Sequence, residues 1–176
     1  KGKKLFARLI TLEDKGDGYF DQIICDGDNP ATFAARAKQY EQENPGTQVV
    51  LQVAGTFTST GFEPNGSVFH DGKQVGWSTP NPNYGGVVVL DPKAKPQVLP
   101  KSAFNPADIG GKDAFQTFTV VENGVPQHFK DTSSFTRRAL IQRDYIDSSG
   151  RSQKQWAVLE TEVPMNLTDF GLFLKD

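Results

Sequence analysis

The two histidines of this sequence, His70 and His128, are the side chains best suited to bind a transition metal or to transfer a proton near neutral pH. They lie far apart in the chain, and a metal site built on both would need carboxylate ligands that the spacing does not supply. Surface or hydrogen-bonded histidines are therefore the favoured interpretation. Cys25 is the single cysteine, which excludes an intramolecular disulfide and a metal site made of thiolates. We expect neither a metal nor a cofactor.

Two adjacent arginines, Arg137 and Arg138, open a segment with strand character. Side chains alternate between the two faces of a strand, so one arginine could face a cleft while the other faces solvent. A guanidinium in a cleft can bind an anion through two parallel hydrogen bonds. The alternative is that both arginines are solvated. Arg143 and Asp144 carry the same ambiguity.

Other short motifs are incomplete as ligand sites. Asp26-Gly27-Asp28 begins like a calcium-binding loop but lacks the terminal glutamate, so helix capping explains it better. Gly85-Gly86 precedes a strand and does not join a strand to a helix, which argues against a phosphate-binding loop. No serine stands in a Gly-x-Ser-x-Gly motif, which argues against a serine hydrolase.

Two helices are predicted, one near each end of the chain. Asp28 or Asn29 caps the first helix, Pro30 occupies its first turn, and Pro45-Gly46 ends it. Asn166 caps the second helix, with Asp169 as its capping-box partner.

Strands are predicted wherever apolar and β-branched residues alternate or form short runs between turn residues. Hairpins are expected for residues 5–11 with 19–25, 114–122 with 125–130 around Asn123-Gly124, and 136–142 with 155–160. Further strands are expected at residues 47–54, at 67–70 before a turn at Asp71-Gly72, and at 86–90, which a Pro- and Lys-containing connection follows. These elements predict a single α+β domain, residues 1–176, with mixed or largely antiparallel sheets and a helix near each end.

Composition limits the classes of partner. The formal charge is −2 with both signs spread along the chain, which argues against nucleic acid. No apolar run approaches the roughly 18 residues that a membrane span needs. The chain opens at Lys1, so we expect that a leader or a larger N-terminal part has been removed. An extracytoplasmic or secreted protein is expected, with a cytoplasmic location as the open alternative.

Several motifs occur in a fixed order over most of the chain, and together they resemble the phosphodiester glycosidase family. The lysosomal member of that family uncovers mannose 6-phosphate by removing a capping N-acetylglucosamine. The matching pieces are a Gly-rich turn ending in Phe (55–57), Pro-x-Gly (64–66), Asp-Gly-Lys (71–73), Gly85-Gly86, the strand at 136–140 and the helix start at 165–170.

The chain departs from the family pattern in two places. The family's Asn-Gly-Gly-Phe turn reads Ala54-Gly55-Thr56-Phe57 here, which loses a polar side chain. The family's Leu-Asp-Gly-Gly segment follows the final helix, and this sequence ends at Asp176 before reaching it. The resemblance therefore implies a domain that is incomplete at its C-terminus.

The resemblance implies a hydrolase that cleaves the bond between the anomeric carbon of a sugar and a phosphodiester oxygen. Phosphate leaves readily, so such a site must bind phosphate and stabilise positive charge on the sugar. Arg137 is the implied phosphate ligand, and backbone amides near Gly55 and Gly66 are secondary donors. The implied catalytic residues are Arg137, Glu63, Asp71 and Asp144, and the implied substrate-binding residues are Gly55, Thr56, Phe57 and Gly66.

The alternative is a non-catalytic domain of the same fold that binds a glycan or another protein. Either function implies a carbohydrate or sugar-phosphate ligand, or a protein partner such as a companion fragment, and neither implies nucleic acid or a membrane span.

Overall fold

The computed structural model describes residues 7–12, 30–52, 55, 64–75, 79–91 and 93–175. These ranges contain two α-helices and three antiparallel sheets, so the predicted α+β class with largely antiparallel sheets is confirmed. The chain packs as two compact units: unit 1 is Lys1–Gly18 with Thr119–Asp176, and unit 2 is Tyr19–Phe118. The single domain expected from the sequence stays a prediction beside these two compact units. No helix of the described residues is long and apolar enough to cross a membrane.

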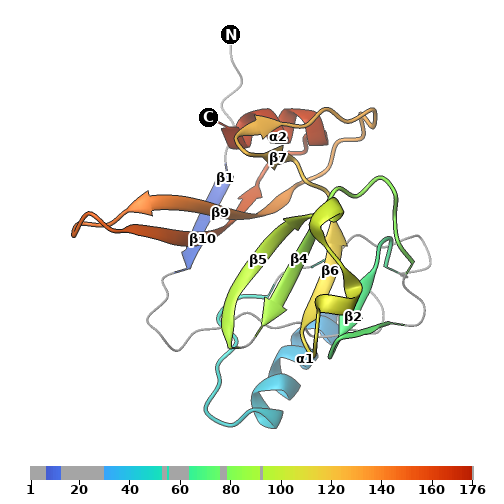
Figure 1. The fold of residues 1–176 in the computed structure, drawn as a ribbon, viewed down its shortest axis with the longest axis vertical. Helices are drawn as coiled ribbons and strands as arrows, with labels where there is room; N and C mark the ends of the chain where they lie inside the picture. The colour runs from blue at the N-terminus through green and yellow to red at the C-terminus, as the bar shows by residue number, and fades with distance from the viewer. Residues whose placement is uncertain are drawn as a thin grey trace. The chain divides into compact units, whose positions relative to one another are not determined.

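Unit 2 contains a five-stranded antiparallel sheet in the order β3-β2-β6-β4-β5 (Figure 1). Its strands are β2 (Val68–His70), β3 (Lys73–Gln74), β4 (Gly86–Asp91), β5 (Ala94–Pro100) and β6 (Asp113–Thr117). The unit also contains α1 (Pro30–Glu43) and two short 3-10 helices, η1 (Lys101–Ala103) and η2 (Pro106–Asp108). The first predicted helix is confirmed, and Pro30 stands at its first position.

The core of unit 2 forms on one face of this sheet. The register places Phe69, Ala114 and Val89 side by side across three strands, with Val87 two residues along β4. Alternation puts these side chains on the same face, where Ile109 packs against them after η2. The apolar run of β4 is buried on both faces, as the sequence predicted for residues 86–90.

Two predictions for unit 2 are wrong. The predicted connection after β4 contains a strand, β5, which stands at the sheet edge and pairs only with β4 among the described strands. An edge strand accepts proline because one side needs no ladder hydrogen bonds, and Pro96 lies beside a register shift in the β4–β5 pairing. Residues 47–52, predicted as part of a strand, form none, and Val50 is 82% exposed. A β-branched run becomes a strand only where a partner strand is available.

One glutamine joins the sheet to the neighbouring loop in unit 2. The Gln116 Oε1 atom accepts from the backbone N–H groups of Ser67 at 3.2 Å and Asn81 at 2.9 Å. Its Nε2 donates to the backbone oxygens of Asn81 at 2.7 Å and Tyr84 at 3.1 Å. The buried Gln116 side chain therefore satisfies four backbone groups.

Both units contain the same kind of tight turn. In unit 2, Asp71 and Gly72 join β2 to β3 with φ angles of 50° and 74°. In unit 1, Asn123 and Gly124 join β7 (Val121–Glu122) to β8 (Val125–Pro126) with φ angles of 51° and 76°. Positive φ at both central residues is typical of a type I′ turn, for which Asn-Gly and Asp-Gly are preferred. Both predicted turns are confirmed, although the segment predicted as one strand over residues 114–122 is divided between β6 and β7.

Unit 1 contains a three-stranded antiparallel sheet in the order β1-β10-β9, formed by β1 (Ala7–Leu12), β9 (Arg138–Ile146) and β10 (Ser152–Thr161). The long β9–β10 hairpin confirms the pair predicted around residues 147–150 (Figure 1). Strand β1 pairs with β10, and residues 19–25, its predicted partner, lie outside the described residues. The helix α2 (Leu167–Lys175) buries Leu167, Phe170 and Gly171.

The α2 cap gives a first testable prediction. The Asp169 N–H donates to Asn166 Oδ1 at 2.8 Å, and Asn166 Nδ2 donates to Asp169 Oδ2 at 2.9 Å. We expect Asn166→Ala to lower the free energy of unfolding by about 1 kcal/mol, because an N–H group of the first turn loses its acceptor. Urea denaturation measures this loss. Asn166→Ser keeps an acceptor and should cost clearly less, so equal losses in both variants would contradict the capping role.

Candidate functional site

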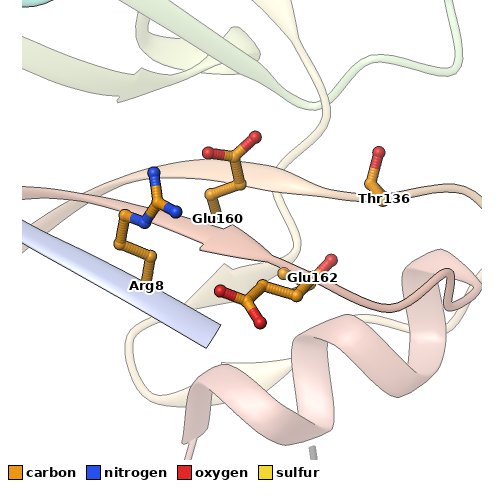
Figure 2. A pocket seen from close by; sticks show the side chains of 5 residues that line it. Arg8, Thr136, Glu160 and Glu162 are labelled. Atoms are coloured by element: carbon orange, nitrogen blue, oxygen red, sulfur yellow. The ribbon is translucent and has the colours of Figure 1, made fainter. Parts of the chain in front are cut away.

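A cavity of about 400 Å³ opens in unit 1 where β1 and β10 meet the segment before β9 (Figure 2). Its lining combines one arginine, two glutamates and two threonines: Arg8, Thr136, Glu160, Thr161 and Glu162. The volume lies within the range of small-molecule sites. Charges of both signs therefore face the same space.

The sheet register explains why these charges meet. Arg8 lies opposite Glu160 across β1 and β10, and Glu160 lies opposite Arg138 across β10 and β9. Directly opposed side chains of antiparallel strands point to the same face. Figure 2 shows the Arg8 and Glu160 side chains rising from the same side of the sheet, and Glu162 extending toward the end of β1 that carries Arg8.

Arg138 holds Glu160 at the edge of this cavity. Its Nε donates to Glu160 Oε1 at 3.0 Å, and its Nη2 donates to the same oxygen at 2.6 Å. Both bonds reach Oε1, so Arg138 does not use the Oε2 atom of Glu160. Arg8 supplies a fork of donors that matches a phosphate or carboxylate group, and the glutamates can accept from hydroxyl groups or stabilise positive charge.

Arg137, the implied phosphate ligand, lies directly beside cavity residues but is 7% exposed. Its Nε donates to the Met165 backbone oxygen at 2.9 Å, and its Nη2 donates to the Ser133 backbone oxygen at 2.8 Å. Its guanidinium also lies 5.2 Å from the centre of the Phe135 ring. Its backbone N–H donates to Oγ1 of Thr161, a cavity residue, at 2.8 Å. Arg137 thus anchors the backbone around the cavity.

Arg137 remains positively charged although its side chain is buried. Burial lowers the pKa of its guanidinium below the usual value, and the Asp131 carboxylate opposes that shift. An arginine remains positively charged at neutral pH under such conditions. Within the described chain its Nη1 donates to no acceptor, and direct binding of phosphate by Arg137 stays a prediction.

The other implied catalytic residues are Asp144, Asp71 and Glu63. Asp144 lies on β9 seven positions beyond Arg137, which corresponds to about 23 Å along an extended strand, so these two residues do not share a site. Asp71 belongs to unit 2, in the turn after β2. Glu63 lies outside the described residues.

The implied substrate-binding residues are partly described. Gly55 is exposed, and an added Cβ would lie 3.4 Å from the Phe115 ring. Gly66 is buried, and an added Cβ would lie 3.1 Å from the Tyr84 ring, so close packing explains this glycine. Thr56 and Phe57 lie outside the described residues.

In unit 2, the side chain of Asp71 lies beside His70 and Asp113. His70 Nδ1 lies 3.2 Å from Asp113 Oδ2, and His70 Nε2 lies 3.9 Å from Asp71 Oδ2. The Asp71 backbone N–H donates to Asp113 Oδ1 at 2.8 Å. The ligand atoms of these three side chains all lie within 4.8 Å of one another.

The chain matches no protein-family model, no curated protein and no solved structure. The cavity of unit 1 and the sequence motifs are therefore the features that bear on function. Arg8, Glu160 and Glu162 were not predicted as site residues, because the β1–β10 pairing that joins them links opposite ends of the chain. The sequence shows these charged residues in segments with strand character. Their positions in space follow only once the pairing register of the strands is known.

Proposed function

We propose that this protein is a hydrolase that removes a sugar from a sugar-1-phosphodiester, with the cavity of unit 1 as its substrate site. The observation that carries the proposal is that Arg8 and two glutamates, Glu160 and Glu162, line the same cavity of about 400 Å³. The motif resemblance to phosphodiester glycosidases supports the same reaction. A sugar phosphate carries both a negative group for the arginine and hydroxyl groups for the carboxylates.

The proposed reaction divides the work between these side chains. Arg8 binds the phosphate oxygens and stabilises the negative charge that grows on them as the bond from the anomeric carbon breaks. The bonding electron pair leaves with the phosphate oxygen, while the carboxylates stabilise the positive charge on the sugar ring. Water adds to the anomeric carbon, and one carboxylate takes its proton and passes it to solvent. The products are a free sugar and a phosphate monoester.

The test uses the methyl phosphodiester of a sugar 1-phosphate and measures the release of reducing sugar. We expect Arg8→Gln to lower kcat/KM about 10- to 100-fold, because hydrogen bonds between charged groups contribute about 1.5–3 kcal/mol. Arg151→Gln is the matched control. Arg151 is an exposed arginine of the same unit that bonds to Ser149 at the hairpin tip, and its variant should retain full turnover. Equal turnover in wild type and Arg8→Gln would refute the proposed site.

A second candidate is a binding domain without turnover. It is favoured by Arg137, since the residue that matches the family arginine holds the backbone of Ser133 and Met165. This candidate predicts saturable binding of the same phosphodiester, measured by calorimetry, with no sugar released. It also predicts weaker binding in Arg8→Gln. Absence of both binding and turnover across a panel of sugar phosphodiesters would refute both candidates.

A further inference from the structure

The side chains of His70, Asp71 and Asp113 gather where β2 ends, the following turn begins and β6 starts. This group belongs to unit 2 and does not depend on the proposed hydrolase site. His70 is a half-exposed residue at the strand end, Asp71 occupies the first central position of the type I′ turn, and Asp113 is buried. It combines an imidazole with two carboxylates.

The contact between Asp113 and His70 sets the orientation of the imidazole ring. Asp113 Oδ2 lies 3.2 Å from Nδ1, and a carboxylate favours the tautomer that carries the proton on Nδ1 and the lone pair on Nε2. Histidines that bind metals generally donate their second ring N–H to a carboxylate or a carbonyl, which fixes the ring and raises its basicity. His70 has this arrangement with Nε2 as the outward nitrogen.

We propose that His70 Nε2 and the Asp71 carboxylate bind a divalent transition metal ion, best matched by zinc, while Asp113 orients the imidazole. Zinc binds nitrogen at about 2.0–2.1 Å and carboxylate oxygen at about 2.0–2.2 Å, so tetrahedral coordination places two such atoms about 3.4 Å apart, a distance that the exposed Asp71 side chain can reach by a small rotation. The observed separation between His70 Nε2 and Asp71 Oδ2 is 3.9 Å. The imidazole distinguishes this group from clusters made only of surface carboxylates. Nitrogen ligands favour zinc over calcium and magnesium.

The backbone around Asp71 is held in place. The Gly72 N–H donates to the Lys112 backbone oxygen at 2.8 Å, and the Asp71 N–H donates to Asp113 Oδ1 at 2.8 Å. Both bonds connect the turn to the segment that carries Asp113. A ligand on a fixed turn loses less conformational entropy when it binds an ion than a ligand on a free loop does.

Charge and exposure are compatible with a bound cation. Lys112, the cation next to Asp113 in the chain, pairs with Asp91 at 3.6 Å. Lys73 lies opposite His70 in the register, and in the described chain it forms no ion pair with these aspartates. The side chains of His70 and Asp71 are 45% and 83% exposed, which leaves coordination positions for water or for a ligand.

The full chain is first treated with a chelator and desalted. It is then titrated with zinc, and calorimetry measures the binding. We expect one zinc ion to bind per chain in the wild type. His70→Gln keeps a donor for Asp113 but removes the imidazole, and it should weaken zinc binding at least about tenfold, as should Asp71→Asn. Asp113→Asn removes the orienting carboxylate and should weaken binding about 10- to 100-fold. His128→Gln, at the exposed histidine of unit 1, is the matched control and should leave binding unchanged.

Circular dichroism of each variant establishes that the fold is retained, so a loss of zinc can be assigned to the ligands. Unchanged zinc affinity in His70→Gln would overturn the proposal, as would the absence of zinc binding by the wild type at millimolar zinc. Equal losses in His70→Gln and His128→Gln would indicate non-specific binding and would also overturn it. Stronger binding of magnesium or calcium than of zinc would contradict the assigned role of the imidazole.

Discussion

Replacing Gly72 with alanine is expected to destabilise unit 2 by about 3 kcal/mol or more, whereas the same change at Gly124 should cost about 1–2 kcal/mol in unit 1. Both glycines are the second central residue of a type I′ turn, with φ angles of 74° and 76°. Each substitution to alanine therefore carries the same cost of a left-handed backbone. The difference lies in space, because a Cβ at Gly72 would stand 1.7 Å from the Gly110 backbone oxygen, while nothing lies within 4 Å at Gly124.

Urea denaturation combined with hydrogen exchange can assign each loss to its own unit. Gly72→Ala should also weaken the exchange protection of the Gly72 amide, which donates to the Lys112 oxygen. The clash involves backbone on both sides, so no side-chain rotation relieves it. Equal losses for Gly72→Ala and Gly124→Ala would show that the turn does not approach residue 110 as closely as described.

The second large effect is expected at Arg137. We expect Arg137→Ala to lower the free energy of unfolding of unit 1 by about 2–4 kcal/mol, because the buried backbone oxygen of Met165 loses its donor and the packing of the side chain on Phe135 is lost. Arg138→Ala is the adjacent control. Arg138 forms an exposed ion pair with Glu160, and its loss should cost at most about 1 kcal/mol.

Stability and turnover together separate the two roles of Arg137. If Arg137 anchors the backbone, Arg137→Ala should lower the stability of the protein. Conditions that stabilise the fold should then partly restore any lost turnover. A direct phosphate ligand, as the sequence resemblance implies, would lose turnover by orders of magnitude with stability unchanged. The second result would contradict the anchoring role.

Elements set by neighbouring residues were predicted well from the sequence. Pro30 at the start of α1, the Asn166–Asp169 cap of α2, and the Asn123-Gly124 turn all depend on contacts between residues close in the chain. Their physical causes are capping and tolerance of positive φ, which residue type alone indicates. The same holds for the buried run of β4.

Elements that depend on distant partners were predicted poorly. Strand β5 contains two prolines and one lysine, and only its place at a sheet edge explains why it is a strand. The Arg8–Glu160–Arg138 row requires β1 to pair with β10, which no local pattern specifies. The contact of His70 with Asp113 likewise depends on the pairing of β2 with β6.

The four hydrogen bonds of Gln116 have a consequence for how this sequence can vary. The amide bonds to Asn81 and Tyr84 at both ends of a short loop, while residues 82 and 83 between them are exposed. The two residues can consequently be substituted during evolution, but the number of residues between Asn81 and Tyr84 cannot change. An insertion or deletion there would move one end of the loop out of reach of the amide, so the length of this loop should be inherited together with the glutamine.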